Sequence, residues 1–234
     1  MEGSFVLESP KGINELIRTQ PASIQFIVTT QKGASTVMTS EKQVPVYHCS
    51  ETVMGRLTDT STPQELLAVV RKPCRDSQQI LGKPDLFSIY GETIQDPANV
   101  GVIVRLAAAF GVDAVWLSPA SADPFNPKAI RASAGTWLGV PIFTDVALAT
   151  LIGVGIQIYA ADSGHAATTP LGSLTTRPSK LALAFGSEGR GLSQELRQAA
   201  VQRYTIRTEH AVESLNVASA AAIAIYHFRS LPLR

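Results

Sequence analysis

Short apolar runs alternate with stretches of helical periodicity over most of this chain, most clearly after residue 84. The apolar runs predict buried strands, and the segments between them, apolar on one face, predict helices. Strands and helices in alternation indicate a parallel sheet with helices on both faces, so we expect an α/β fold. The expected strands are Leu86–Tyr90, Ala114–Leu117, Ile142–Phe143, Ile156–Ala160, Leu181–Phe185 and Tyr204–Arg207. The expected helices are Val100–Gly111, Pro127–Leu138, Val146–Ile152, Gln194–Val201 and Leu215–Arg229.

The first 72 residues repeat the pattern on a smaller scale and predict a separate small α/β unit without catalytic residues. Ser50 is a suitable N-cap for the second of its helices. Residues 73–84 contain two prolines, a glycine and several polar side chains, so we place a linker there and a second domain at 85–234. The expected elements of the first unit are the helices Gly12–Thr19 and Ser50–Leu57 and the strands Ser23–Thr29, Val44–His48 and Leu66–Val70.

The segment Leu181–Ser193, with the sequence LALAFGSEGRGLS, joins a buried strand to a glycine-rich turn. The apolar run ends at Gly186, and three glycines let the backbone turn sharply and approach a ligand closely. An open α/β sheet places its ligand site where such a strand ends. The spacing matches neither a dinucleotide-binding fingerprint nor a P-loop. The turn alone therefore leaves open whether it cradles a phosphate, holds a nucleotide or merely turns.

Two further segments place polar side chains at the start of predicted helices. In the first, Asp96 or Asn99 can cap the helix, and Arg105 stands on an otherwise apolar helix. A guanidinium there is paired with a carboxylate, extends to solvent or has a function. In the second, Ser214 can cap the last helix, and Asn216 is a second capping group or a functional one. The small residues that follow indicate that a backbone or a ligand passes close by, or that the helix packs tightly.

Composition excludes several classes of protein. Charged residues make up 17% of the chain and the formal net charge is +1, so any contact with nucleic acid needs a local basic patch. No apolar run reaches the length of a membrane span, and the first residues lack the order of a signal peptide. The two cysteines have no metal-ligand or redox spacing, so we expect no metal site and a reducing, cytoplasmic compartment.

Three motifs in register give the chain a family resemblance. Asn99-x-Gly101-x-x-x-Arg105, FGSEGRGLS at 185–193 and SLNVASAAAI at 214–223 resemble the signature motifs of the SpoU-type (TrmH-like) RNA 2′-O-ribose methyltransferases of the SPOUT superfamily. Residues 123–135 are also similar to that family, and residues 1–72 resemble the small RNA-binding domain of many members. The resemblance implies a Rossmann-like catalytic domain with a C-terminal trefoil knot, and a homodimer with its active site near the interface.

The resemblance also implies a cofactor and a set of site residues. The family binds S-adenosylmethionine in the knot, and Gly186, Ile206 and Leu215 match positions whose main chain holds it. Transfer of a methyl group to a ribose 2′-hydroxyl requires that this weak nucleophile be oriented and deprotonated. By position, the catalytic residues are Arg105, Asn99, Glu188, Ser214 and Asn216.

The resemblance makes Arg105 the central catalytic residue. We assign it the task of holding the target phosphate and hydroxyl, which suits a planar guanidinium fork. Arginine has also been proposed as the general base in this family, but a free guanidinium stays protonated at ordinary pH. A phosphate-assisted relay is the simpler route for the proton, and Glu188 is expected to orient Arg105 or Asn99.

The chain departs from the family pattern after Ile206. Many members read Ile-Pro-Met there, whereas this chain continues with Arg207-Thr208-Glu209-His210. An active RNA 2′-O-methyltransferase is the first interpretation, because all five polar family residues are present. The altered loop supports the alternative, a non-catalytic RNA- or ribosome-binding member. The two-domain layout favours ribosomal RNA over the other candidate substrate, transfer RNA.

Overall fold

The computed structural model describes residues 3–37, 44–58, 64–163, 168–209 and 214–234. The chain forms two compact units, one of residues 1–74 and 125–135 and the other of residues 75–124 and 136–234. The chain thus passes from the first unit to the second within the expected linker, and a later segment returns to the first unit. No helix in these described ranges is long and apolar enough to cross a membrane.

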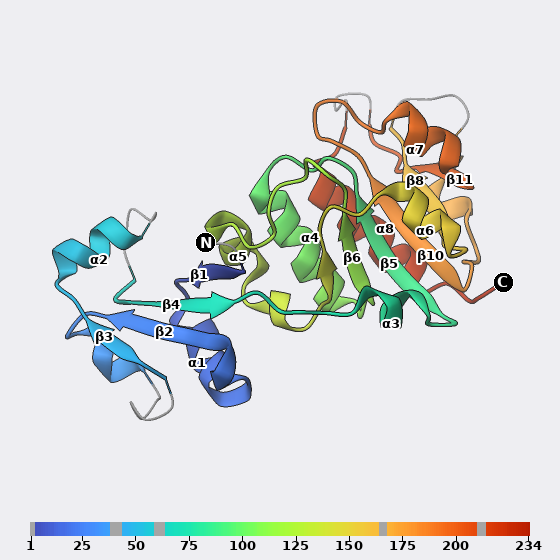
Figure 1. The fold of residues 1–234 in the computed structure, drawn as a ribbon. Coiled ribbons are helices and arrows are strands. Elements are labelled where there is room, and N and C mark those ends of the chain that lie inside the picture. The colour runs from blue at the N-terminus through green and yellow to red at the C-terminus, as the bar shows by residue number, and fades with distance from the viewer. Residues whose placement is uncertain (1–2, 38–43, 59–63, 164–167, 210–213) are drawn as a thin grey trace. The chain divides into compact units, whose positions relative to one another are not determined.

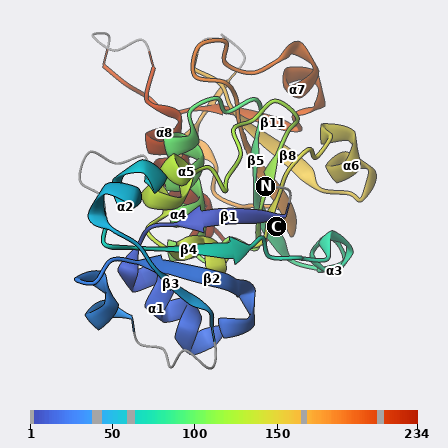
Figure 2. The same cartoon turned by 60° about the vertical axis from the view of Figure 1, so that its left-hand side comes forward.

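The first unit is a four-stranded sheet in the order β1-β4-β2-β3, and Figure 2 shows α1 beside it. Ser9 caps α1, and the buried face of the helix contains Ile13, Leu16 and Ile17. Ser50 caps α2 as predicted, by accepting a hydrogen bond from the Val53 amide at 3.3 Å. The elements of this unit are β1 (Ser4–Leu7), α1 (Pro10–Thr19), β2 (Ile24–Thr29), β3 (Val46–His48), α2 (Glu51–Leu57), β4 (Leu66–Arg71) and α5 (Pro127–Ser133).

The second unit contains a seven-stranded sheet in the order β7-β6-β5-β10-β8-β11-β9, of which Figure 1 labels β5, β6, β8, β10 and β11. Each pair of neighbouring strands is parallel, which confirms the predicted α/β fold. Its strands are β5 (Leu86–Gly91), β6 (Ala114–Leu117), β7 (Ile142–Phe143), β8 (Gln157–Ala161), β9 (Thr169–Pro170), β10 (Lys180–Phe185) and β11 (Gln202–Thr205). Its α-helices are α3 (Ser77–Leu81), α4 (Pro97–Ala109), α6 (Leu148–Gly153), α7 (Gln194–Ala199) and α8 (Val217–Arg229).

Helices cover both faces of this sheet. Side chains of α3, α6 and α7 form one core with Ala182 and Ala184 of β10. Because side chains alternate along a strand, Leu181, Leu183 and Phe185 point to the other face, where α8 packs on β10 beside α4. Residues 181–185 are at most 1% exposed, so the predicted strand is buried on both faces.

Several boundaries differ from the predicted ones. Asp96, rather than Asn99, caps α4 through a hydrogen bond from the Ala98 amide. α8 begins at Val217 instead of Leu215, and its cap is Asn216 rather than Ser214. The strands β1 and β9 and the helix α3 were not predicted, because β1 and β9 are short and α3 lies in a proline-flanked polar segment. The trefoil knot stays a prediction.

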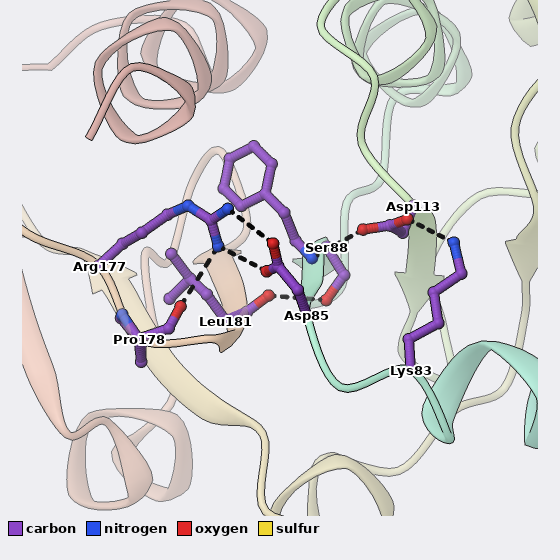
Figure 3. A network of polar contacts seen from close by, with 8 residues as sticks. Lys83, Asp85, Ser88, Asp113, Arg177, Pro178 and Leu181 are labelled. Atoms are coloured by element: carbon purple, nitrogen blue, oxygen red, sulfur yellow. Dashed lines mark hydrogen bonds and ion pairs between the residues drawn. The ribbon is translucent and has the colours of Figure 1, made fainter. Parts of the chain in front are cut away.

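A network of polar contacts anchors the amino ends of β5 and β10 (Figure 3). Arg177 is 5% exposed and donates to both carboxylate oxygens of Asp85, at 3.0 and 3.3 Å. Its guanidinium also lies 5.5 Å from the centre of the Phe87 ring. Ser88 donates to the Leu181 carbonyl at 3.0 Å, which ties the two strands directly. This end of the sheet is therefore a structural anchor.

Asp85→Ala should lower the free energy of unfolding by about 3 kcal/mol, because it leaves a guanidinium that is only 6% exposed without its carboxylate. Urea unfolding measures the change. Glu15→Ala, which breaks an exposed ion pair with Arg18, is the matched control and should cost at most about 0.5 kcal/mol. Equal losses in the two variants would show that the Arg177–Asp85 pair, of which only Arg177 is buried, contributes no more than a surface pair.

Candidate active site at the carboxyl ends of β5 and β10

The order of strands reverses between β5 and β10, because the chain continues from β5 to β6 and β7 on one side and returns through β8 on the other. An open α/β sheet binds its ligand at the carboxyl ends of the strands at such a point. The loop after β5 leads into α4, and the turn after β10 is the predicted glycine-rich turn. Thr93 in the first loop has a φ of 54°, which is unusual for a β-branched residue and marks a constrained loop.

The glycine-rich turn is closed by its own backbone. The Ser187 amide donates to the Gly191 carbonyl at 3.1 Å, and the Gly191 amide donates back at 2.8 Å. Gly191 has a φ of +66°. A Cβ on Gly186 would collide with the Gly191 carbonyl and lie 2.7 Å from the Leu192 amide nitrogen, whereas a Cβ on Gly189 would meet nothing within 4 Å. Only glycine at 186 therefore lets the two arms of the turn close.

Three side chains from distant segments join beside this turn in one chain of hydrogen bonds. Asn99 of α4 donates to the Glu188 carboxylate at 2.8 Å. Asn216 donates to the Asn99 side-chain oxygen at 3.0 Å. The side-chain oxygen of Asn216 meanwhile accepts from the Ala218 and Ser219 amides at the start of α8. Asn216 therefore caps the helix and also joins the network, and its catalytic role stays a prediction.

The network sets the charge of Glu188. Partial burial disfavours the charged carboxylate and by itself raises its pKa. Hydrogen bonds from Asn99 and from the backbone amides of Glu188, Gln95 and Asp96 act in the opposite direction. They outweigh burial and hold the pKa of Glu188 below its ordinary value of 4.5. Glu188 is thus a fixed anion at neutral pH and orients Asn99, one of its two expected partners.

Glu188→Gln should reduce stability at neutral pH, because an amide cannot accept both the Asn99 and the Gln95 hydrogen bonds equally well. Since the pKa of Glu188 is lowered by folding, its stabilising effect is complete above pH 4.5 and is lost as the pH falls through the lower folded value. Urea unfolding at a series of pH values should show the difference from the wild type shrink in that acidic range. A loss of stability for Glu188→Gln that does not change with pH would refute the assignment.

A cleft of about 1050 Å³ opens next to the network. It is formed by the glycine-rich turn, the segment after β11 and the start of α8. The three predicted cofactor residues, Gly186, Ile206 and Leu215, all line it. The predicted catalytic residues Glu188, Ser214 and Asn216 line it as well, and Asn99 is linked to it through Glu188.

Arg105 lies apart from these residues. It is exposed on α4, does not line the cleft and, among the described residues, makes no hydrogen bond or ion pair. Of the three alternatives for this guanidinium, pairing with a carboxylate is not seen in the described residues, and extension to solvent or a function remains. The network consequently orients Asn99, and Arg105 remains open to a ligand.

Glu92 is a site-supporting residue that sequence reasoning missed. Its carboxylate accepts from the Ser193 amide at 2.8 Å and from the Ser193 hydroxyl at 2.7 Å, and Ser193 caps α7. It therefore holds the far end of the glycine-rich turn. The available signal was a carboxylate directly after a fully buried strand.

Comparison with known proteins identifies the family. The model of the SpoU rRNA Methylase family matches residues 87–226, and that of the MRM3-like substrate binding domain matches residues 1–68. The first match covers more than half of the chain, and it includes all three segments that meet at the cleft. The protein belongs to the SpoU rRNA methylase family.

Individual relatives agree with this membership. The 23S rRNA (guanosine(2553)-2′-O)-methyltransferase RlmP of Bacillus subtilis is 28% identical over 97% of this chain and 88% of its own. A putative RNA methyltransferase of the TrmH family from Porphyromonas gingivalis is 31% identical, with a TM-score of 0.79 over 97% of this chain and 90% of that one. The AdoMet-bound rRNA methyltransferase from Sinorhizobium meliloti, 22% identical, shares the fold with a TM-score of 0.82 over 96% and 86%.

Proposed function

We propose that this protein transfers the methyl group of S-adenosylmethionine to a ribose 2′-hydroxyl of RNA. The observation that carries the proposal is the meeting of Asn99, Glu188 and Asn216 in one hydrogen-bonded chain beside the cleft. Membership of a family of rRNA methylases supports the reaction class. The related RlmP is a 2′-O-methyltransferase by name, which supports the ribose hydroxyl as the acceptor.

The cleft fits a cofactor built from a nucleoside and an amino acid. Backbone groups of Gly186, Ile206 and Leu215 at strand ends and turns suit the polar edges of adenine and ribose. Apolar side chains such as Ile206 and Leu215 suit the ring faces. S-adenosylmethionine would supply an electrophilic methyl group there, and crystal structures of related methyltransferases contain AdoMet.

The chain's own residues have distinct tasks in this proposal. Arg105, exposed and unpaired among the described residues, binds the target phosphate and holds the 2′-hydroxyl in line for attack. Glu188 stays charged and fixes Asn99, which presents its remaining hydrogen-bonding capacity to the ribose. Ser214, at the cleft, is placed to contact the substrate. The proton leaves through a relay that involves the bound phosphate.

RNA is the proposed partner, and ribosomal RNA is preferred. The first unit matches a substrate-binding domain model, which supports a role for residues 1–72 in RNA binding. The relatives RlmP and the Streptomyces viridochromogenes enzyme are named for 23S rRNA, which supports this preference over tRNA. We place the protein in the cytoplasm, where the free Cys49 and Cys74 would stay reduced.

We further propose that the protein acts as a homodimer. The outer face of α8 presents Ile223, 42% exposed, and Tyr226, 68% exposed, three residues apart on one side of the helix. Tyr226 also makes an edge contact with Phe110, which follows α4. An apolar stripe of this kind supports an interface between two copies.

Tyr226→Asp should convert the dimer to a monomer, because a carboxylate at the centre of an apolar interface would be buried without a partner. Light scattering coupled to gel filtration measures the mass. Val201→Asp is the matched control, since Val201 is 61% exposed and lies outside α8. A Tyr226→Asp protein with the same mass as the wild type would refute this interface.

Calorimetry with S-adenosylmethionine tests the proposed function against its non-catalytic alternative. Arg207, Thr208 and Glu209 line the cleft, so the altered loop borders the proposed cofactor site, and His210 is outside the described residues. Saturable binding of one cofactor per chain is expected, and no binding would favour the alternative.

Mapping 2′-O-methyl groups in RNA from cells with and without the protein would then identify the substrate, which should be ribosomal RNA rather than tRNA.

A further inference from the structure

Asp162, directly after β8, is a buried carboxylate that the assigned site residues do not use. Its side chain is 4% exposed, yet it belongs to the lining of the cleft. Its amide donates to the Tyr204 carbonyl of β11 at 2.9 Å, which fixes its backbone. A carboxylate buried to this extent requires positive partners.

Two arginines meet at this carboxylate. Arg197 of α7 donates through Nε to Oδ2 at 3.3 Å, and Arg203 of β11 donates through Nη1 to the same oxygen at 3.5 Å. Two guanidinium groups share one carboxylate, so the cluster keeps one net positive charge. Of the two arginines only Arg197 lines the cleft. Arg197 therefore brings a positive charge to the cleft lining.

The outer donors of Arg197 are open. Within the described part of the chain, its Nε is engaged and its two Nη groups make no hydrogen bond. A Cβ built on Gly191 would lie 3.7 Å from Nη2, so this group lies beside the glycine-rich turn. The helix that carries Arg197 is itself fixed, because Glu92 holds its cap Ser193. The fork is thus held at one edge and free at the other.

We propose that Asp162 holds Arg197 as the anion-binding arm of this cleft, an inference that rests on the proposed function. The anion is the carboxylate of the cofactor's amino acid portion or a phosphate of the bound RNA, and a planar fork suits both. An ion pair that only tied α7 to the sheet would gain most from a bidentate contact. Here one donor is used, and the remaining donors lie at the cleft.

Calorimetry with two cofactor fragments on Arg197→Met distinguishes the two anions. S-adenosylhomocysteine carries the carboxylate, and 5′-methylthioadenosine lacks the amino acid portion. If the anion is the carboxylate, the variant should bind S-adenosylhomocysteine at least tenfold more weakly and methylthioadenosine within twofold of the wild type. If the anion is a phosphate, both fragments should bind to the variant as they do to the wild type. The KM for RNA should then rise at least fivefold while kcat stays within twofold. The slope of the logarithm of RNA affinity against the logarithm of salt concentration should become shallower by about 0.7.

Two results would overturn the inference. One is equal weakening of both fragments, which would mean that Arg197 only shapes the cleft. The other is no change in either fragment or in the KM for RNA. Arg203→Met is the matched control, because Arg203 places the same charge on the same carboxylate but does not line the cleft. It should bind both fragments within twofold of the wild type, and losses equal to those of Arg197→Met would also overturn the inference.

The role of Asp162 as a positioning residue has its own test. Asp162→Asn should show the pattern of Arg197→Met at smaller amplitude, and Arg197→Lys should fail to restore tight binding, because an ammonium has no fork. If Asp162→Asn binds these ligands like the wild type while Arg197→Met binds them more weakly, Asp162 does not position Arg197. Thermal melting verifies that each variant is folded. A wild-type protein that binds no S-adenosylhomocysteine would instead refute the proposed function itself.

Discussion

Gly186→Ala should weaken binding of S-adenosylmethionine about a hundredfold, which corresponds to about 2.7 kcal/mol. An added Cβ would collide with the Gly191 carbonyl and come within 2.7 Å of the Leu192 amide. These are backbone atoms, so the collision cannot be relieved by a side-chain rotation, and the closed turn must open. Because the proposed cofactor contacts depend on the shape of that turn, calorimetry should show the loss directly.

Gly189→Ala provides the matched control within the same turn. A Cβ at this position meets nothing within 4 Å, so the turn should stay closed and the affinity should change less than about threefold. A melting curve of each variant separates a local change of the turn from global unfolding. Equal affinities for the two variants would contradict the proposed role of Gly186.

Arg105→Ala should lower kcat for methyl transfer about a thousandfold and leave the affinity for S-adenosylmethionine within twofold. The reason is geometric: Arg105 is exposed and lies outside the cleft proposed for the cofactor, so we expect its loss to affect the RNA and not the cofactor. Single-turnover kinetics with saturating cofactor measures the effect.

Arg105→Lys separates charge from shape in the same assay. A lysine keeps the positive charge but cannot make a two-pronged contact with a phosphate, so it should recover only part of the rate. Activity of Arg105→Ala within tenfold of the wild type would exclude a central role for this residue. A large loss of cofactor affinity would show that Arg105 acts in cofactor binding and not in methyl transfer to the RNA.

The middle of the central sheet was predictable because β5, β6 and β10 are short, mostly apolar and almost entirely buried, whereas β9 at the edge was missed. Residues 181–185 illustrate this, since their apolar run has no polar interruption and they occupy the middle of the sheet. β1 escaped prediction because it has four residues and pairs at an edge. α3 escaped because its cap, Asp76, lies among prolines and polar residues that also suit a linker.

The candidate site was predictable in its parts but not in its connections. Ser214 and Asn216 are both good capping residues, and sequence alone does not choose between them. The choice falls on Asn216, which bonds the first turn of α8 and Asn99 together. Glu92 and Asp162 were missed for a similar reason, since their partners, Ser193 and Arg197, are far away in the sequence.

Methylation of RNA in a purified system tests the central claim most directly. Ribosomal RNA from cells that lack the protein is incubated with the wild-type chain and S-adenosylmethionine carrying a labelled methyl group, and the digested nucleosides are analysed by mass spectrometry. We expect label in a 2′-O-methylated nucleoside, and incorporation with Arg105→Ala at about a thousandth of the wild-type initial rate. Label on a base, or no label from a protein that binds the cofactor, would contradict it.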